Sequence, residues 1–229
     1  AETGLVFSES FDDFNSINAN NGRCGWDGPF CSRDSNIDFV QGLDGKAVQF
    51  GIQPKNFLGP IIFYPRYSDP TQGTLEFWVK PTSTGSIYNS DLAYPKIGTV
   101  KNGNIITALF QLNSDYFLSV NENNLGWHKA GISWNCNDGN HVILFIDDKT
   151  TDVYYNYCNY LWSYYYKLVV GNPYVGEPAY DAIDNLKAYS IAKPKSQIIA
   201  EFKQRVPDRN PKINSFTPSK KDVFSPAGT

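Results

Sequence analysis

Short strand-like runs, separated by turn residues, constrain the fold of this chain more than any other feature. The runs are rich in β-branched and aromatic residues, and Gly, Asn and Asp cluster between them. They are residues 47–50, 61–64, 74–80, 105–112, 116–120, 129–134, 141–147, 167–170 and 182–189. Many short strands with almost no helix predict an all-β fold, a two-sheet antiparallel sandwich or a barrel, rather than alternating strands and helices.

Two of these runs indicate how they are buried. In residues 75–80 apolar side chains alternate with Glu76, Trp78 and Lys80, the two-residue period of a sheet that is covered on one side. Residues 142–146 are apolar at every position, which is typical of a strand packed between two layers.

One helix is expected, near the end of the chain. Residues 196–204 begin with Ser196, a residue type that caps helices, and place Ile198, Ile199 and Phe202 along one side. We therefore expect one short C-terminal helix docked on the sandwich.

Composition excludes several classes of protein. Of the 229 residues, 41% are hydrophobic and 15% aromatic, enough to bury a large core in one large domain or two small ones. The net charge of −3 offers no basic surplus for a nucleic-acid backbone. No apolar run approaches the roughly 18 residues of a membrane-spanning helix, so this fragment is not expected to insert into a membrane.

The four cysteines favour disulfides over a metal site. Cys24 and Cys31 flank a turn-rich loop, which leaves Cys136 and Cys158 to pair around a hairpin, although four cysteines permit three connectivities. A zinc site is the rival interpretation, but the spacings are not those of short knuckles. Disulfides indicate an extracellular or cell-surface protein.

Both ends of the chain lie outside the expected domain. Residues 1–4 resemble what a secretion vector leaves after signal cleavage, an expression scar, and residues 228–229 resemble a cloning scar. The domain is expected over residues 5–205, followed by a Pro-rich linker over 206–229. Residues 211–219 resemble the opening strand of immunoglobulin-like modules in large prokaryotic surface proteins.

The order of motifs along residues 5–203 resembles the laminin-G-like jelly-roll family of the concanavalin-A-like lectin and glucanase superfold. The matching segments are GLDGKAVQF (42–50), GTLEFWVKP (73–81), GWHKAGISW (126–134), VILFIDD (142–148), KLVVGN (167–172) and the closing segment 182–202. The resemblance implies a two-sheet jelly-roll sandwich that works as a binding or spacer module in a larger cell-surface protein. Its expected partners are a glycan or a cell-surface protein, and neighbouring domains of the same chain.

The resemblance also implies a structural calcium ion. The family's ligand positions correspond to Asp12 or Asp13, Gly45 and Asp184, and hard oxygen ligands suit Ca²⁺. Alternatively, Asp12 and Asp13 cap a turn and Asp184 accepts backbone hydrogen bonds.

No catalytic residues are expected. Glucanases of this superfold carry a Glu-x-Asp-x-x-Glu strand, which this sequence lacks, so a glycosidase remains only a remote alternative. The sequence contains no nucleophile-elbow motif that could form a catalytic triad with His128 or His141, and we expect both histidines to be structural or surface groups.

Residues 153–167 are unusually rich in tyrosine. Tyrosine and tryptophan offer a flat apolar face with a polar tip, suited to stacking on sugar rings. The candidate ligand contacts are Trp78, Tyr160, Trp162, Tyr164 and Tyr165. They predict a non-catalytic, carbohydrate-binding or adhesive module. The alternative is that the rings cover the edge of the sandwich in a spacer or protein-interaction domain without a glycan ligand.

Overall fold

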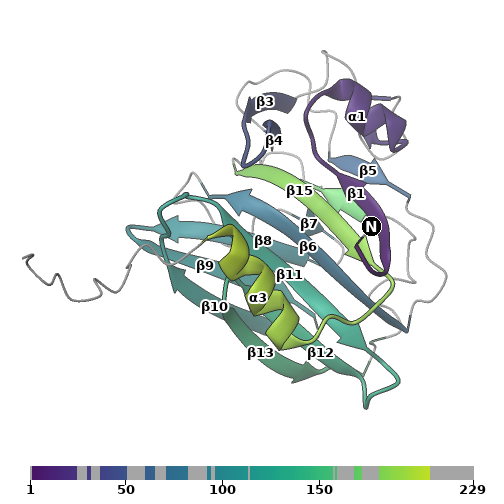
Figure 1. The fold of residues 1–229 in the computed structure, drawn as a ribbon, viewed down its shortest axis with the longest axis vertical. Helices are drawn as coiled ribbons and strands as arrows, with labels where there is room; N and C mark the ends of the chain where they lie inside the picture. The colour runs from purple at the N-terminus through teal and green to yellow at the C-terminus, as the bar shows by residue number, and fades with distance from the viewer. Residues whose placement is uncertain are drawn as a thin grey trace, which may run out of the picture.

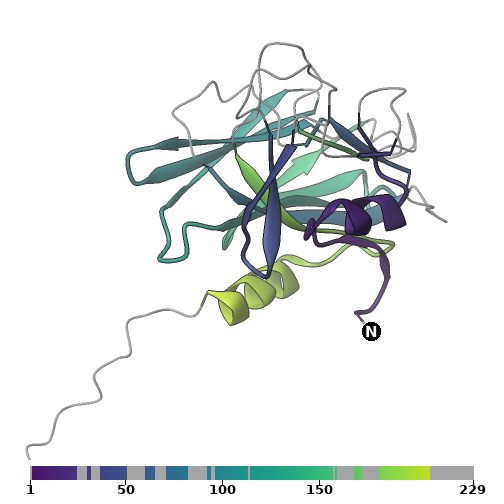
Figure 2. The same ribbon diagram turned by 90° about the horizontal axis from the view of Figure 1, so that it is seen from above.

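The computed structural model describes residues 2–24, 30–31, 37–50, 60–64, 71–81, 92–93, 96–112, 114–156, 158, 168–171 and 181–206. Over these residues the chain forms two antiparallel sheets, which we call A and B, with a helix on the outer face of sheet A (Figures 1 and 2). The predicted all-β sandwich with a C-terminal helix is confirmed.

Sheet A holds the strands that position the site described below. Its order is β13 (Lys149–Tyr154), β12 (His141–Ile146), β11 (His128–Asn135), β6 (Gln72–Lys80), β15 (Ala182–Tyr189), β4 (Lys46–Phe50) and β3 (Ile37–Gln41). Strand β1 (Leu5–Glu9) pairs with the second half of β15, where Ser8 lies opposite Lys187. The start of β15 pairs with β4.

Sheet B closes the other side of the core. Its order is β10 (Asp115–Asn121), β9 (Ile105–Gln111), β8 (Lys96–Asn102), β7 (Leu92–Ala93), β14 (Leu168–Val170), β5 (Ile61–Phe63) and β2 (Arg23–Cys24). All nine strand-like runs of the sequence correspond to strands of the two sheets. The strands that were not predicted, such as β8 and β13, carry lysine, glycine or threonine at positions where the pattern gave no apolar alternation.

The core lies between the sheets. Leu75, Phe77 and Val79 of β6 are fully buried in it, as the alternation predicts. The other face of β6 is also covered, because Glu76 is only 5% and Trp78 only 8% exposed. This corrects the expectation of a sheet open on one side, and α3 provides the cover. On β12 both faces are buried, as expected.

The C-terminal helix α3 (Lys195–Arg205) is present, but its start differs from the prediction. Pro194 is its N-cap and makes no side-chain capping bond, so Ser196 is inside the helix. Ile198 and Phe202 are buried as predicted, whereas Ile199 is only partly buried.

A second, unpredicted helix follows β1. Helix α1 (Phe14–Ala19) is only six residues long, too short to show an amphipathic period. Asp13 caps it by accepting a hydrogen bond from the Ser16 backbone N–H at 2.8 Å, and the Ser16 hydroxyl bonds back to the Asp13 backbone. The reciprocal capping bonds account for the helix where hydrophobic periodicity does not.

Both expected disulfides are present, Cys24–Cys31 and Cys136–Cys158. The second joins the start of the β11–β12 turn to the chain after β13. Neither helix in the described part of the chain has the length and apolar character that a membrane crossing needs. The predicted linker, apart from Val206, lies outside the described residues.

Candidate functional site

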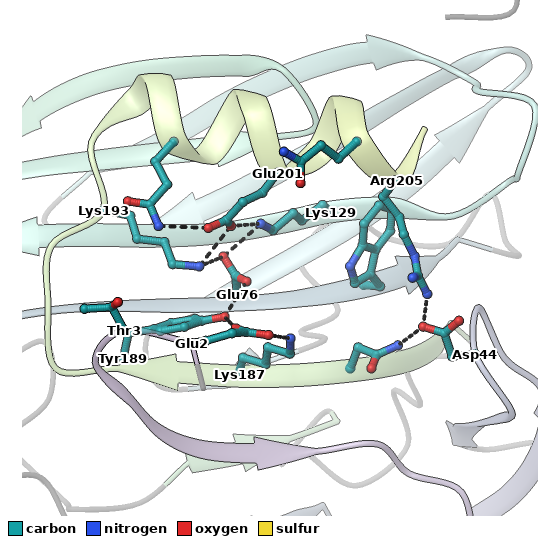
Figure 3. Close-up of a pocket in the computed structure, with 14 residues that line it drawn as sticks. Glu2, Thr3, Asp44, Glu76, Lys129, Lys187, Tyr189, Lys193, Glu201 and Arg205 are labelled. Carbon is teal, nitrogen blue, oxygen red and sulfur yellow. Dashed lines mark hydrogen bonds and ion pairs between the residues drawn. The ribbon is translucent and has the colours of Figure 1, made fainter. Parts of the chain in front are cut away.

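A cavity of about 400 Å³ lies between α3 and the outer face of sheet A (Figure 3). Its lining comes from α3 and the segment that leads into it, from three neighbouring strands of the sheet, from the turn before β4 and from the segment before β1. The lining residues are Glu2, Thr3, Asp44, Glu76, Trp78, Lys129, Asn185, Lys187, Tyr189, Lys193, Gln197, Glu201, Gln204 and Arg205. Most of these side chains can donate or accept hydrogen bonds, which suits a polar ligand.

Strand geometry explains why charged side chains gather here. Successive side chains of a strand point to opposite faces, so burying Leu75 and Phe77 in the core turns Glu76 outward. Glu76 lies opposite Lys187 of β15 on one side and Gly131 of β11 on the other. Gly131 leaves no room for a side chain, since an added Cβ would lie 2.2 Å from the Leu75 carbonyl oxygen.

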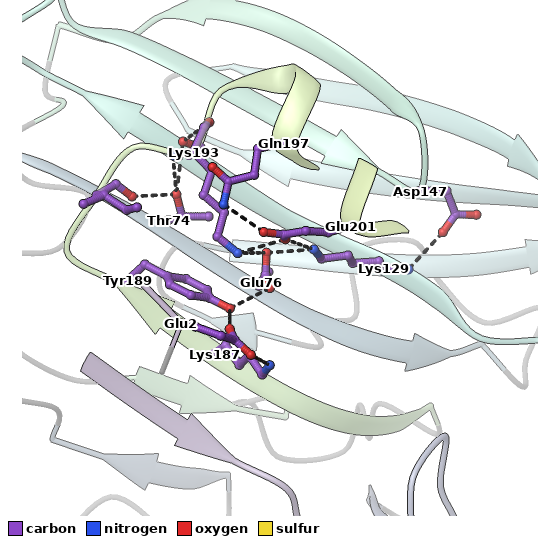
Figure 4. A network of polar contacts seen from close by, with 12 residues as sticks. Glu2, Thr74, Glu76, Lys129, Asp147, Lys187, Tyr189, Lys193, Gln197 and Glu201 are labelled. Carbon is purple, nitrogen blue, oxygen red and sulfur yellow. Dashed lines mark hydrogen bonds and ion pairs between the residues drawn. The ribbon is translucent and has the colours of Figure 1, made fainter. Parts of the chain in front are cut away.

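Two lysines and two glutamates form the centre of the cavity wall (Figure 4). Lys129 Nζ lies 2.9 Å from Glu76 Oε2 and 2.8 Å from Glu201 Oε2. Lys193 Nζ lies 3.2 Å and 2.9 Å from the same two oxygens. We call these four residues the charge cluster. Each cation contacts both anions, so the cluster is neutral and ties α3 to β6 and β11.

Burial makes these contacts strong. The side chains of Lys129 and Lys193 are 4% and 2% exposed, and that of Glu76 is 7% exposed. Burial alone would raise the pKa of Glu201, but hydrogen bonds from Lys129, Lys193 and Gln197 outweigh it and lower that pKa to about 2. Glu201 therefore stays ionised at neutral pH.

The segment that leads into α3 is fixed by hydrogen bonds to sheet A. The Lys193 backbone N–H donates to Thr74 Oγ1 at 2.9 Å, and the Ser133 hydroxyl donates to the Lys193 carbonyl at 2.9 Å. The Thr74 hydroxyl donates to the Ile191 carbonyl at 2.8 Å. These bonds set the position from which Lys193 reaches the charge cluster.

The end of the cavity near the C-terminus of α3 has an aromatic floor. Trp78 of β6 stacks on Phe202 of α3, with ring centroids 6.1 Å apart and planes 28° apart. Arg205 forms an ion pair with Asp44 in the turn before β4, and Asn185 contacts the same carboxylate at 3.5 Å. This end combines an aromatic surface with planar polar groups.

Tyr189 lies at the opposite end, under the segment before β1. Its hydroxyl contacts the Glu2 carboxylate and lies 3.1 Å from Glu76 Oε1. Lys187 Nζ is 2.5 Å from Glu2 Oε1. Burial and the two nearby carboxylates raise the pKa of Tyr189, so its phenol keeps its proton.

The predicted ligand contacts fall into two groups. Trp78 lines the cavity, although it is only 8% exposed and its ring stacks on Phe202. Tyr160, Trp162, Tyr164 and Tyr165 lie outside the described residues, so their role stays a prediction.

Three of the four candidate calcium ligands lie together. Asp12 Oδ1 accepts a hydrogen bond from the Lys46 backbone N–H at 2.9 Å, and a Cβ added to Gly45 would lie 2.2 Å from that oxygen. Asp184 Oδ2 accepts from the Leu43 N–H at 2.7 Å. Burial, with a contribution from the Asp12 charge, raises the pKa of Asp184 to about 7.

Asp13 instead caps α1. Among the residues that the structure describes, Asp184 Oδ1 is buried and has no hydrogen-bond partner, and a carboxylate oxygen of this kind can bind a cation. Within the described ranges, no three His, Cys, Asp or Glu side chains form a metal cluster. Any cation there would depend on two carboxylates, a backbone carbonyl and water.

The two histidines make local contacts. His128 is fully buried, and its Nδ1 lies 2.8 Å from Asp147 Oδ2, while the Lys129 N–H donates to the other Asp147 oxygen at 2.9 Å. This pair holds the turn after β12. His141 Nε2 lies 2.8 Å from Asp152 on the neighbouring strand β13.

Apart from Trp78, the sequence analysis did not select the residues that line the cavity. One signal was present: Glu76 is a charged residue inside a strand whose other face is entirely core. The partners of Glu76 lie 53 to 117 positions away in the sequence, so no local pattern connects them.

Comparisons with known proteins show the fold. No protein-family model matches the sequence, and no curated protein matches it. The structure is similar to the binding domain of botulinum neurotoxin serotype D/C, with a TM-score of 0.57 and 12% identity over 88% of this chain and 52% of that chain. For the binding domain of Paraclostridial Mosquitocidal Protein 1 the TM-score is 0.54 and the identity 14%, with the same coverage. The chain thus spans about half of those two chains.

A third similar structure matches over almost its whole length. It is Domain 4 of AbnA, a GH43 extracellular arabinanase from Geobacillus stearothermophilus, solved in complex with arabinotriose. The TM-score is 0.53 and the identity 18%, over 87% of this chain and 98% of that domain. At such low sequence identities, the structural similarity shows a shared β-sandwich fold.

Proposed function

We propose that this chain is a non-catalytic, extracellular carbohydrate-binding module of the laminin-G-like type, and that it holds its ligand in the cavity under α3. The observation that carries the proposal is the composition of that cavity. Saccharides are recognised by planar polar groups that pair with hydroxyls and by aromatic rings that pack against C–H faces. Asn185, Gln197 and Gln204 supply the first kind of group, and Trp78, which is 8% exposed, supplies the aromatic ring of the lining.

Other findings support this proposal. A domain of similar fold and nearly equal length was solved with arabinotriose, and the other similar structures are binding domains of toxins. The two disulfides favour an oxidising, extracellular environment. A weak single site gains avidity when modules are tethered together, which suits a domain of a multidomain surface protein.

The test is a glycan panel probed with the purified domain presented multivalently. We expect Gln204→Trp, which fills the cavity from α3, to abolish binding. Lys203→Trp adds the same ring to the neighbouring position of α3, which does not line the cavity, and should leave binding intact. Loss of binding only in a Trp162→Ala/Tyr164→Ala variant would move the site to the aromatic segment. A silent panel would reject glycan binding and favour the spacer or protein-interaction role.

We also propose that Asp12, Asp184 and the Gly45 carbonyl hold a structural Ca²⁺. The partnerless oxygen of Asp184 supports this, as does the nearby carboxylate of Asp12. Free calcium at a concentration one hundredfold above the dissociation constant of the site would raise the free energy of unfolding by about 2.7 kcal/mol. We expect calcium to raise the melting temperature of the wild type but not that of Asp184→Asn. An equal melting temperature in calcium and in EDTA would reject the site.

A further inference from the structure

One carboxylate of the cavity differs from the other three. Glu76 and Glu201 belong to the charge cluster, and Asp44 is paired with Arg205 at the end of α3. Glu2, in contrast, lies before β1 within residues 1–4, the segment that resembles an expression scar, and its side chain is 49% exposed. It reaches the cavity wall only through its carboxylate, which contacts Lys187 and Tyr189 (Figure 3).

The Tyr189 hydroxyl has one proton but lies near two carboxylates. Both lysines of the charge cluster contact Glu76 Oε2, whereas the phenol lies 3.1 Å from the other oxygen, Oε1, and its contact with Glu2 is shorter. The proton is therefore available to whichever carboxylate takes the position of Glu2. Because Tyr189 is only 1% exposed, this donor is fixed in place before a ligand arrives.

The pairing of charged groups in the cavity wall also indicates that the position of the Glu2 carboxylate is a binding site. The cavity wall carries four carboxylates and four cations, and each cation other than Lys187 contacts a carboxylate of the folded body. Among the described residues, Lys187 forms its ion pair with Glu2. If Glu2 moves away, one positive charge remains beside a buried hydroxyl donor, which is a site for a carboxylate.

We propose that Glu2 occupies a carboxylate subsite as an internal stand-in, and that the ligand of this cavity is an acidic saccharide whose uronate group displaces it. This inference rests on the function proposed above. The saccharide carboxylate takes the two bonds from Tyr189 and Lys187, and its hydroxyls face Gln197, Gln204 and Asn185 along the wall. Each uncharged amide both donates and accepts, as the hydroxyls of a saccharide do, and an acidic peptide is the alternative that the test separates.

The test compares glucuronate with glucose, which share a ring and differ in the carboxylate, by NMR titration of labelled protein. We expect glucuronate to shift the signals of Lys187 and Tyr189 and to bind Glu2→Gln about three- to tenfold more tightly than the wild type, because an internal competitor is removed. Tyr189→Phe in the Glu2→Gln background should lose that gain. Asp138→Asn, which removes one exposed carboxylate outside the cavity, should match the wild type.

Equal glucuronate affinity in the wild type and Glu2→Gln, or an absence of shifts around Tyr189, would overturn the carboxylate subsite. Tighter binding of N-acetylglutamate amide than of glucuronate would overturn the saccharide and point to an acidic peptide. The glycan panel separates these failures from failure of the proposed function. Neutral glycans that bind the wild type and are lost in Gln204→Trp would preserve the function while the acidic subsite fails.

Discussion

Replacing Lys193 with methionine tests whether the charge cluster holds α3 on the sandwich. Methionine keeps the aliphatic stem but removes the cation that contacts Glu76 and Glu201. Removing one partner of a buried ion pair costs about 3 to 5 kcal/mol. Here Lys129 still contacts both carboxylates and Glu201 is 31% exposed, so we expect a smaller loss, about 2 to 3 kcal/mol.

The assay is urea unfolding at neutral pH, with the free energy of unfolding extrapolated to water. Lys195→Met is the matched control, because Lys195 also lies in this region and pairs with Asp152, but both side chains are about two-fifths exposed. Exposed pairs of this kind contribute about 0 to 1 kcal/mol. Adding Glu201→Gln to Lys193→Met should recover part of the loss, since it removes one of the two carboxylates that lost a partner.

Equal unfolding free energies for Lys193→Met and Lys195→Met would refute this reasoning. It would mean that the cluster is solvated in solution and that α3 is held by Ile198 and Phe202 alone. A loss of the expected size together with an unchanged m-value would place the effect in the folded state.

Two further predictions concern stability. The pKa of Glu201 is about 2 in the folded state against an ordinary value of 4.5, so the unfolded state binds more protons between these values. The contribution of Glu201 to the free energy of unfolding should be complete above pH 4.5 and lost as the pH falls towards 2. When the free energy of unfolding is measured against pH, Glu201→Gln should lack this part of the pH dependence. The same pH dependence in the wild type and the variant would contradict the assignment. Replacing both Cys136 and Cys158, which are 22 residues apart, with serine should lower the unfolding free energy by about 3 kcal/mol, and urea curves that match the oxidised wild type would contradict a stabilising disulfide.

The sequence predicted the sandwich well because its strands carry local signals. Alternation in β6 and the apolar run of β12 identified core residues correctly. Helix α1 was missed because its stability comes from capping by Asp13 rather than from periodicity. The covered outer face of β6 was missed because the cover, α3, joins the sheet through pairs such as Lys129 and Glu201, 72 residues apart.

The cavity and the charge cluster have a common origin. Only Ile198 and Phe202 of α3 are buried, so the helix lacks a continuous apolar face. Ion pairs between lysine and glutamate side chains also hold it on the sheet. Long side chains separate the helix from the sheet, and the space between them becomes the cavity. The contacts that hold α3 also shape the wall that a ligand would meet. Lys193→Met should therefore weaken ligand binding as well as stability, whereas Gln204→Trp should block binding and leave the unfolding free energy close to that of Lys203→Trp.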